Sequence, residues 1–236
     1  ESHEVIEEFM IAANIAVAQL LTAKDIPYLR RAHGHPDELR LKNFQEFCQG
    51  LGYEVTVVCL SFGERGESAT LWKQKGMSLE KVKSNRRKEA ENAAKVLDAY
   101  NIQFLDLGDY PLDLGNDAKF RLVEIIREVQ PNFMMTHSQY DPYNTDHMYT
   151  SRLAMEVRMI AQAWGHNPGE KILGAPQLYL FEPHQTEQMG WVPNVFLDIT
   201  EVWGKKRAAI ECMEGQKHLW EYYTNVARNR ANHFRR

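Results

Sequence analysis

The chain lacks the features that mark several common classes of protein. It has three cysteines in 236 residues, Cys48, Cys59 and Cys212, too widely spaced for a disulfide framework or a CxxC metal clip. It has no basic surplus, because 28 Lys+Arg stand against 32 Asp+Glu, and this removes the electrostatic case for nucleic acid. No apolar run approaches the roughly 20 residues that span a bilayer, and the first residues lack the layout of a signal peptide. We therefore expect a cytoplasmic protein without nucleic-acid or membrane partners.

Motifs of phosphate and serine chemistry are also missing. The sequence contains no P-loop, no dinucleotide-binding fingerprint and no G-x-S-x-G elbow. The hydrophobic share of 44% and the charged share of 25% are nevertheless those of a folded globular protein. A chain of this length is sufficient for one large domain or two small ones.

Two regions of different character follow one another along the chain. Apolar residues recur at three- and four-residue spacing over residues 4–23, which predicts a helix, and a second helix is expected over 37–50. At Gly52 the pattern changes to β-branched, apolar runs that are typical of buried strands. We therefore divide the chain into an N-terminal helical segment, residues 1–50, and an α/β domain, residues 51–236.

Strands and helices alternate through the second region. The predicted strands cover residues 54–60, 102–107, 132–136, 178–181 and 195–199, and the predicted helices cover 79–99, 116–129, 149–164 and 201–228. This alternation predicts a doubly wound, mostly parallel sheet with helices on both faces.

Three polar loops leave the carboxyl ends of these strands, where ligands of open α/β sheets bind. They cover residues 61–68, 106–111 and 136–147. Glu64 in the first loop is either a catalytic carboxylate or a solvated turn residue. His147 in the third is either a metal ligand or a helix N-terminal histidine paired with Asp146.

Three further histidine positions carry weaker signals. His137, at a strand end, is expected to be a hydrogen-bonded structural residue, whereas His184 is either a general acid or a rim residue. Upstream, His33, His35, Asp37 and Glu38 lie within six residues on a Gly/Pro turn. That group has zinc-ligand chemistry, although Pro36, Asp37 and Glu38 also fit an ordinary helix start.

Several long stretches resemble one family. They are GYEVTVVCLSFGERGESATLWKQ, FLDLGDYPL, THSQYDPYNTDH, LGAPQLYLFEPHQ and FLDITEVWGKKRAAIECMEGQKHLWEYY. These stretches resemble the 4-oxalomesaconate hydratases of the LmbE-like (PIG-L, N-acetylglucosaminyl deacetylase) superfamily, over about three quarters of the chain. The resemblance implies an LmbE-like, Rossmann-like fold. Residues 1–50 instead resemble a fragment of an RNase II-type exoribonuclease that lacks the magnesium-binding aspartates of those nucleases, so we expect no nuclease activity.

The resemblance to the hydratases implies addition of water to 4-oxalomesaconate, a small tricarboxylate. Glu64 matches the acid of the family's GERG loop and is the candidate base, with Glu67 as its reserve. His184 is the candidate acid. Arg65 would pair with a substrate carboxylate. Asn144 stands where the deacetylases of the superfamily carry an oxyanion-binding histidine, so we assign it to substrate binding and prefer hydration to amide hydrolysis.

The resemblance also implies a zinc ion, with His147 as one ligand and a histidine–carboxylate pair from upstream as the others. His35 and Glu38 imitate the family's HPDD motif, with His33 and Asp37 as further donors. Residues 26–31 would then form the central strand, which Pro27 and two arginines fit badly. We expect an impaired metal site. Two alternative functions are left open: a zinc-dependent deacetylase and a catalytically silent chimera. The sequence also leaves open whether the protein is a homo-oligomer.

Overall fold

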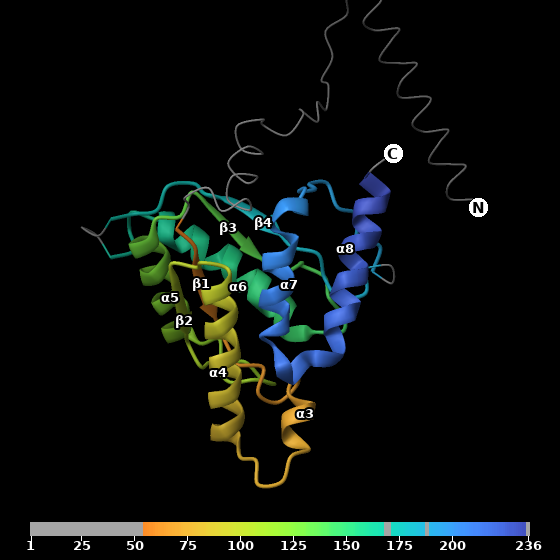
Figure 1. Cartoon of the computed structure of the whole chain (residues 1–236). Coiled ribbons are helices and arrows are strands. Elements are labelled where there is room, and N and C mark those ends of the chain that lie inside the picture. Colours follow the sequence, from red (N-terminus) through yellow and green to blue (C-terminus); the bar gives the residue numbers. More distant parts are fainter. Residues whose placement is uncertain (1–53, 168–170, 187–188, 235–236) are drawn as a thin grey trace, which may run out of the picture. The chain divides into compact units, whose positions relative to one another are not determined.

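The computed structural model describes residues 54–167, 171–186 and 189–234, all within the unit Phe44–Arg236 (Figure 1). Several predictions fall outside the described residues: the helices over 4–23 and 37–50, the central strand over 26–31 and the cluster over 33–38.

Two parallel strand pairs form the centre of the described region. β1 (Thr56–Cys59) pairs with β2 (Asn101–Phe104), and β3 (Phe133–Thr136) pairs with β4 (Gln177–Leu180). No ladder joins one pair to the other among the described residues. Because both strands of a pair run the same way, their following loops leave at the same end. Loops 61–68 and 106–111 therefore emerge together, as do loops 137–144 and 181–186.

A shared apolar core connects the two strand pairs. Helices α5 (Asn116–Val129) and α6 (Thr145–Gln162) pack on each other. Their buried residues include Leu122, Val123, Leu153 and Val157. Val58 of β1 and Met134 of β3 both pack against this cluster. The core therefore holds both pairs against the same two helices, although no ladder joins them.

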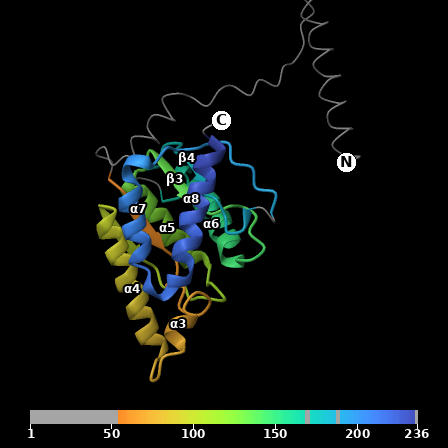
Figure 2. The same cartoon turned by 45° about the vertical axis from the view of Figure 1, so that its right-hand side comes forward.

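A second helix layer is built from α4 (Leu79–Val96) and α7 (Trp203–Glu211), which pack on each other, and α4 also contacts β2. In Figures 1 and 2 the strands lie between this layer and the α5–α6 layer. The remaining elements are the short helix α3 (Ala69–Trp72), the 3-10 helices η2 (Thr200–Val202) and η3 (Glu214–Leu219), and the helix α8 (Trp220–Phe234). Parallel strands between helix layers confirm the predicted fold class.

Local chemistry fixes the helix ends that the sequence predicted. The hydroxyl of Ser78 accepts a hydrogen bond from the Lys81 amide at 3.4 Å and caps the start of α4. α5 ends at Gln130, which adopts a left-handed conformation with φ of 49°. Both helices match their predicted ranges closely.

Three predictions need correction. α6 begins at Thr145, four residues earlier than expected, so His147 lies inside its first turn. Residues 195–199 are not a strand: they alternate in exposure as a strand would, but they pair with no strand of the described chain. The helix expected over 201–228 is interrupted between α7 and α8, where the Gly215 amide donates to Glu89 of α4 at 2.8 Å. Among the described helices, none combines the length and apolarity that a membrane span requires.

Candidate active site

Glu64 lies in the loop after β1 and is 1% exposed. Its Oε2 accepts a hydrogen bond from the Phe62 amide at 3.2 Å, and its Oε1 lies 3.7 Å from Nζ of Lys83. The Glu64 carbonyl accepts a hydrogen bond from Trp72 Nε1 at 2.6 Å. A buried carboxylate needs such hydrogen-bond and charge partners. Glu64 is therefore fixed in position by its neighbours and is not a solvated turn residue.

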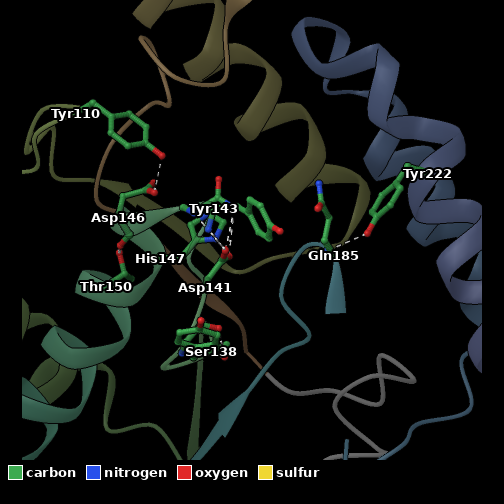
Figure 3. A network of polar contacts seen from close by, with 11 residues as sticks. Tyr110, Ser138, Asp141, Tyr143, Asp146, His147, Thr150, Gln185 and Tyr222 are labelled. Carbon is green, nitrogen blue, oxygen red and sulfur yellow. Dashed lines mark hydrogen bonds and ion pairs between the residues drawn. The ribbon is translucent and has the colours of Figure 1, made fainter. Parts of the chain in front are cut away.

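His147 is oriented by Asp141 in the loop after β3. Its Nδ1 lies 2.8 Å from Oδ2 of Asp141, a residue that is 0% exposed (Figure 3). The other carboxylate oxygen, Oδ1, accepts hydrogen bonds from the backbone amides of Tyr143 and Asn144. The alternative in which His147 pairs with Asp146 is wrong, because His147 pairs with Asp141, whereas Asp146 accepts the hydroxyl of Tyr110 at 3.0 Å. With Nδ1 engaged, Nε2 of His147 remains as a nitrogen for a ligand or a proton.

His137 was expected to be a hydrogen-bonded structural residue, but among the described residues its contacts are ring contacts. Its ring stacks on that of His147 with centroids 4.0 Å apart, and Phe181 meets it edge-on at 4.6 Å. Burial lowers the pKa of His137 to about 4; the adjacent His147 contributes in the same direction and Asp141 opposes it. His137 is therefore neutral at physiological pH.

His184 follows β4 and packs against α8. Its ring centroid lies 4.5 Å from that of Tyr222 and 6.4 Å from that of Tyr223. The neighbouring Gln185 amide donates to the Tyr222 hydroxyl at 3.1 Å (Figure 3). Arg230, two turns further along α8, donates to Glu182 at 2.5 Å. The position of His184 thus depends on α8.

Tyr223 of α8 is subject to the charges of carboxylates from two loops, that of Glu64 and that of His147. Burial raises the pKa of Tyr223, and the charges of Glu67 and Asp141 raise it further, which places both carboxylates within electrostatic reach of the phenol. Glu67 itself accepts a hydrogen bond from Gln216 of η3 at 2.8 Å. The contacts of Tyr222 and Tyr223 with the loop of His184 were not predicted from the sequence, because aromatic residues on an amphipathic helix are ordinarily core residues.

The two predicted substrate-binding residues, Arg65 and Asn144, differ in whether their side chains already have hydrogen-bond partners. Arg65 is exposed, and within the described part of the chain its guanidinium forms no ion pair. The side-chain amide of Asn144 donates to both oxygens of Asp141, at 3.3 and 3.2 Å. Arg65 is therefore available to a ligand, whereas Asn144 already helps to fix the carboxylate that orients His147.

The described residues do not by themselves form a metal site. They contain no group of three or more histidine, cysteine or acidic side chains arranged to hold an ion. A catalytic zinc normally takes three protein ligands, and His147 supplies one. The other predicted donors, His33, His35, Asp37 and Glu38, lie outside the described ranges.

Histidines and buried carboxylates at the carboxyl ends of parallel strands define the class: a Rossmann-like α/β domain with an enzyme-type site. A family model described as GlcNAc-PI de-N-acetylase (PIG-L) matches residues 33–158, more than half of the chain. The chain belongs to the PIG-L family.

Three similar proteins, two hydratases and one deacetylase, represent two kinds of chemistry. The 4-oxalmesaconate hydratase of Pseudomonas putida is 58% identical over 180 residues, which cover 76% of this chain and 69% of that protein. The crystal structure of a 4-carboxy-2-hydroxymuconate hydratase of Pseudomonas putida matches with a TM-score of 0.75 and 56% identity, covering 79% of this chain and 78% of that one. The diacetylchitobiose deacetylase of Thermococcus kodakarensis is 25% identical over 191 residues, 78% of this chain and 67% of that protein.

A short stretch of the chain is similar to a nuclease. The ribonuclease R of Vibrio parahaemolyticus is 47% identical over 55 residues, which are 23% of this chain but 7% of that protein. This agrees with the resemblance noted for the N-terminal segment. So small a share of the nuclease carries no argument for its activity.

Proposed function

We propose that the chain is a hydro-lyase that adds water to 4-oxalomesaconate, across a C=C bond conjugated to a carbonyl group. The observation that carries this proposal is the 58% identity to a hydratase over 76% of the chain, against 25% to a deacetylase. The resemblance noted in the sequence also supports it, because it implies that Asn144 stands where the deacetylases carry an oxyanion-binding histidine.

Each step of the reaction has a candidate group. Glu64 removes a proton from water, and the resulting hydroxide adds to the electrophilic alkene carbon. The electron pair moves onto the conjugated carbonyl as an enolate, and His184 returns a proton to the neighbouring carbon. Arg65 binds a substrate carboxylate with its planar fork of donors. Glu67 is the reserve base, although its hydrogen bond to Gln216 makes it the less available carboxylate.

We further propose that the enzyme uses zinc, held by His147 and by donors among His33, His35, Asp37 and Glu38. A bound zinc would act as a Lewis acid that stabilises the developing enolate charge. The match of the family model begins at His33, which supports a role for this segment. The described residues supply one donor, so the steps above are assigned to the protein's own side chains.

Two alternatives come from other functional classes. A zinc-dependent amide hydrolase is favoured by the deacetylase relative, but residues 144–147 read Asn-Thr-Asp-His and lack the first histidine of that chemistry. A catalytically silent chimera is favoured by the unusual N-terminal segment.

The deciding experiment compares two substrates. Purified protein is mixed with 4-oxalomesaconate, and hydration is followed by loss of the conjugated absorbance. Release of acetate from N,N'-diacetylchitobiose tests the hydrolase. We expect hydration alone, with Glu64→Gln and His184→Asn each lowering kcat by about 10²–10⁴-fold. Glu124→Gln, an exposed change on α5, is the control. Acetate release without hydration would favour the hydrolase, and neither reaction would favour the silent chimera.

A further inference from the structure

The loop after β2 carries a buried carboxylate that reaches into the loop of the candidate base. Asp109 is 3% exposed, and its Oδ2 accepts the backbone amides of Arg65 at 2.5 Å and Gly66 at 2.9 Å. Hydrogen bonds to an ionised acceptor are shorter and about twice as strong as neutral ones. Two such bonds on one buried oxygen hold the turn that immediately follows Glu64.

The next residue extends this contact to the third loop. The ring of Tyr110 covers Gly66 so closely that a Cβ at position 66 would lie 2.4 Å from it. The Tyr110 hydroxyl donates to Oδ1 of Asp146 at 3.0 Å, next to His147 (Figure 3). Asp109 and Tyr110 thus connect the turn of Glu64 to the first turn of α6.

The polar groups of this turn are divided between near and distant partners. The carbonyls of Gly63 and Glu64 are bound by Ser68 and Trp72, from the same loop and from α3. The amides of Arg65 and Gly66 are bound by Asp109, more than 40 residues further along the chain. The local partners therefore hold the carbonyl side of the turn, and its amide side depends on Asp109.

We propose that Asp109 is a positioning residue for the hydration reaction: it fixes the turn that carries Glu64 and Arg65, and Tyr110 fixes that turn to the start of α6. This inference rests on the proposed function, because it gives Glu64 and Arg65 their roles in the reaction. Loss of the carboxylate frees two amides, and the turn moves away from the geometry that the reaction needs. A misplacement of about 1 Å at a reacting group costs about 10²-fold in rate.

The test compares three variants of the full chain. Asp109→Ala removes both hydrogen bonds, whereas Asp109→Asn keeps an oxygen acceptor without the charge. Asp113→Ala is the matched control: it removes an exposed carboxylate of the same loop, one that accepts the Gly115 amide and does not touch the turn. Amide exchange at Arg65 and Gly66 is measured by NMR, and kcat and KM are measured for 4-oxalomesaconate hydration.

We expect Asp109→Ala to exchange these two amides at least about tenfold faster and to lose about 10²-fold in kcat/KM. Asp109→Asn should recover much of both, and Asp113→Ala should change neither. Unchanged exchange in Asp109→Ala would overturn the inference. So would unchanged kcat/KM in that variant while Glu64→Gln is inactive, a result that leaves the proposed function intact. If the wild-type chain does not hydrate the substrate, the proposed function falls, and amide exchange alone decides whether Asp109 holds the turn.

Discussion

Asp141 is the residue that orients His147, although its position in the sequence does not indicate this role. The adjacent Asp146 looked like the natural partner of His147, but the loop folds back so that Asp141, six residues earlier, meets the imidazole at 2.8 Å. Asx-type hydrogen bonds from the amides of Tyr143 and Asn144 to the Asp141 carboxylate shape this turn. Sequence adjacency could not distinguish the two aspartates, because a residue in the first turn of a helix points away from its immediate neighbour.

The two aspartates should therefore differ in their effect on stability. Asp141→Asn places an amide against His147 and against the Asn144 amide, and we expect it to lower the free energy of unfolding by about 2–3 kcal/mol. Asp146→Asn is the control; it weakens one hydrogen bond, with the Tyr110 hydroxyl, and should cost less than about 1 kcal/mol. Urea unfolding at pH 7.5 measures both. Equal losses in the two variants would contradict the assigned pairing.

His137 predicts a dependence of stability on pH. Its pKa is about 4 in the folded chain and about 6.5 when unfolded, so between these values the unfolded state binds more protons. The free energy of unfolding is therefore unaffected by this residue's titration above pH 6.5 and falls as the pH falls from 6.5 toward 4. Since the ring is not fully buried, we expect a loss on the order of 1–3 kcal/mol. His137→Gln should remove this part of the dependence, measured by urea unfolding at pH 4.5 and 7.5. The exposed His218→Gln should leave it unchanged, and a wild-type stability that is flat over this range would refute the assignment.

At the scale of elements, the helices and strands that local sequence patterns determine were predicted correctly. The strands β1 to β4 and the helices α4 and α5 were found because buried apolar runs, helical periodicity and caps are local signals. The interruption between α7 and α8 was missed, since the contact between Gly215 and Glu89 is set by tertiary packing. The strand over 195–199 was wrong for the same reason: alternation of exposure is local, but a strand also needs a partner.

The docking of α8 yields a prediction at this scale. Arg230 donates to Glu182 and Thr186, so it holds the loop of His184 against the helix. Arg230→Ala should raise amide exchange in residues 181–186 and leave β4 protected. Arg228→Ala, an exposed change on the same helix, is the matched control. Exchange measured by mass spectrometry decides the question, and equal exchange in the two variants would show that the loop does not depend on Arg230.

At the scale of the whole molecule, the proposed zinc site would draw on segments that are far apart in the sequence. A catalytic zinc normally takes three protein ligands, and the described part of the chain offers His147. The proposal takes the remaining donors from residues 33–38, which precede β1 in the sequence and fall within the match of the family model. Zinc content therefore reports whether the N-terminal segment works together with the α/β domain.

We expect the purified chain to retain less than one equivalent of zinc after dialysis, because Pro27 and the arginines that follow it fit a central strand poorly. The comparison is a chain in which residues 1–50 are replaced by the corresponding segment of the Pseudomonas putida hydratase. On the zinc proposal, this chain should hold one equivalent of zinc by atomic absorption and should hydrate 4-oxalomesaconate at least about tenfold faster. His147→Ala in the exchanged chain should abolish both gains. One equivalent of zinc in the original chain, lost in His35→Ala and in His147→Ala, would show instead that the present segment already completes the site.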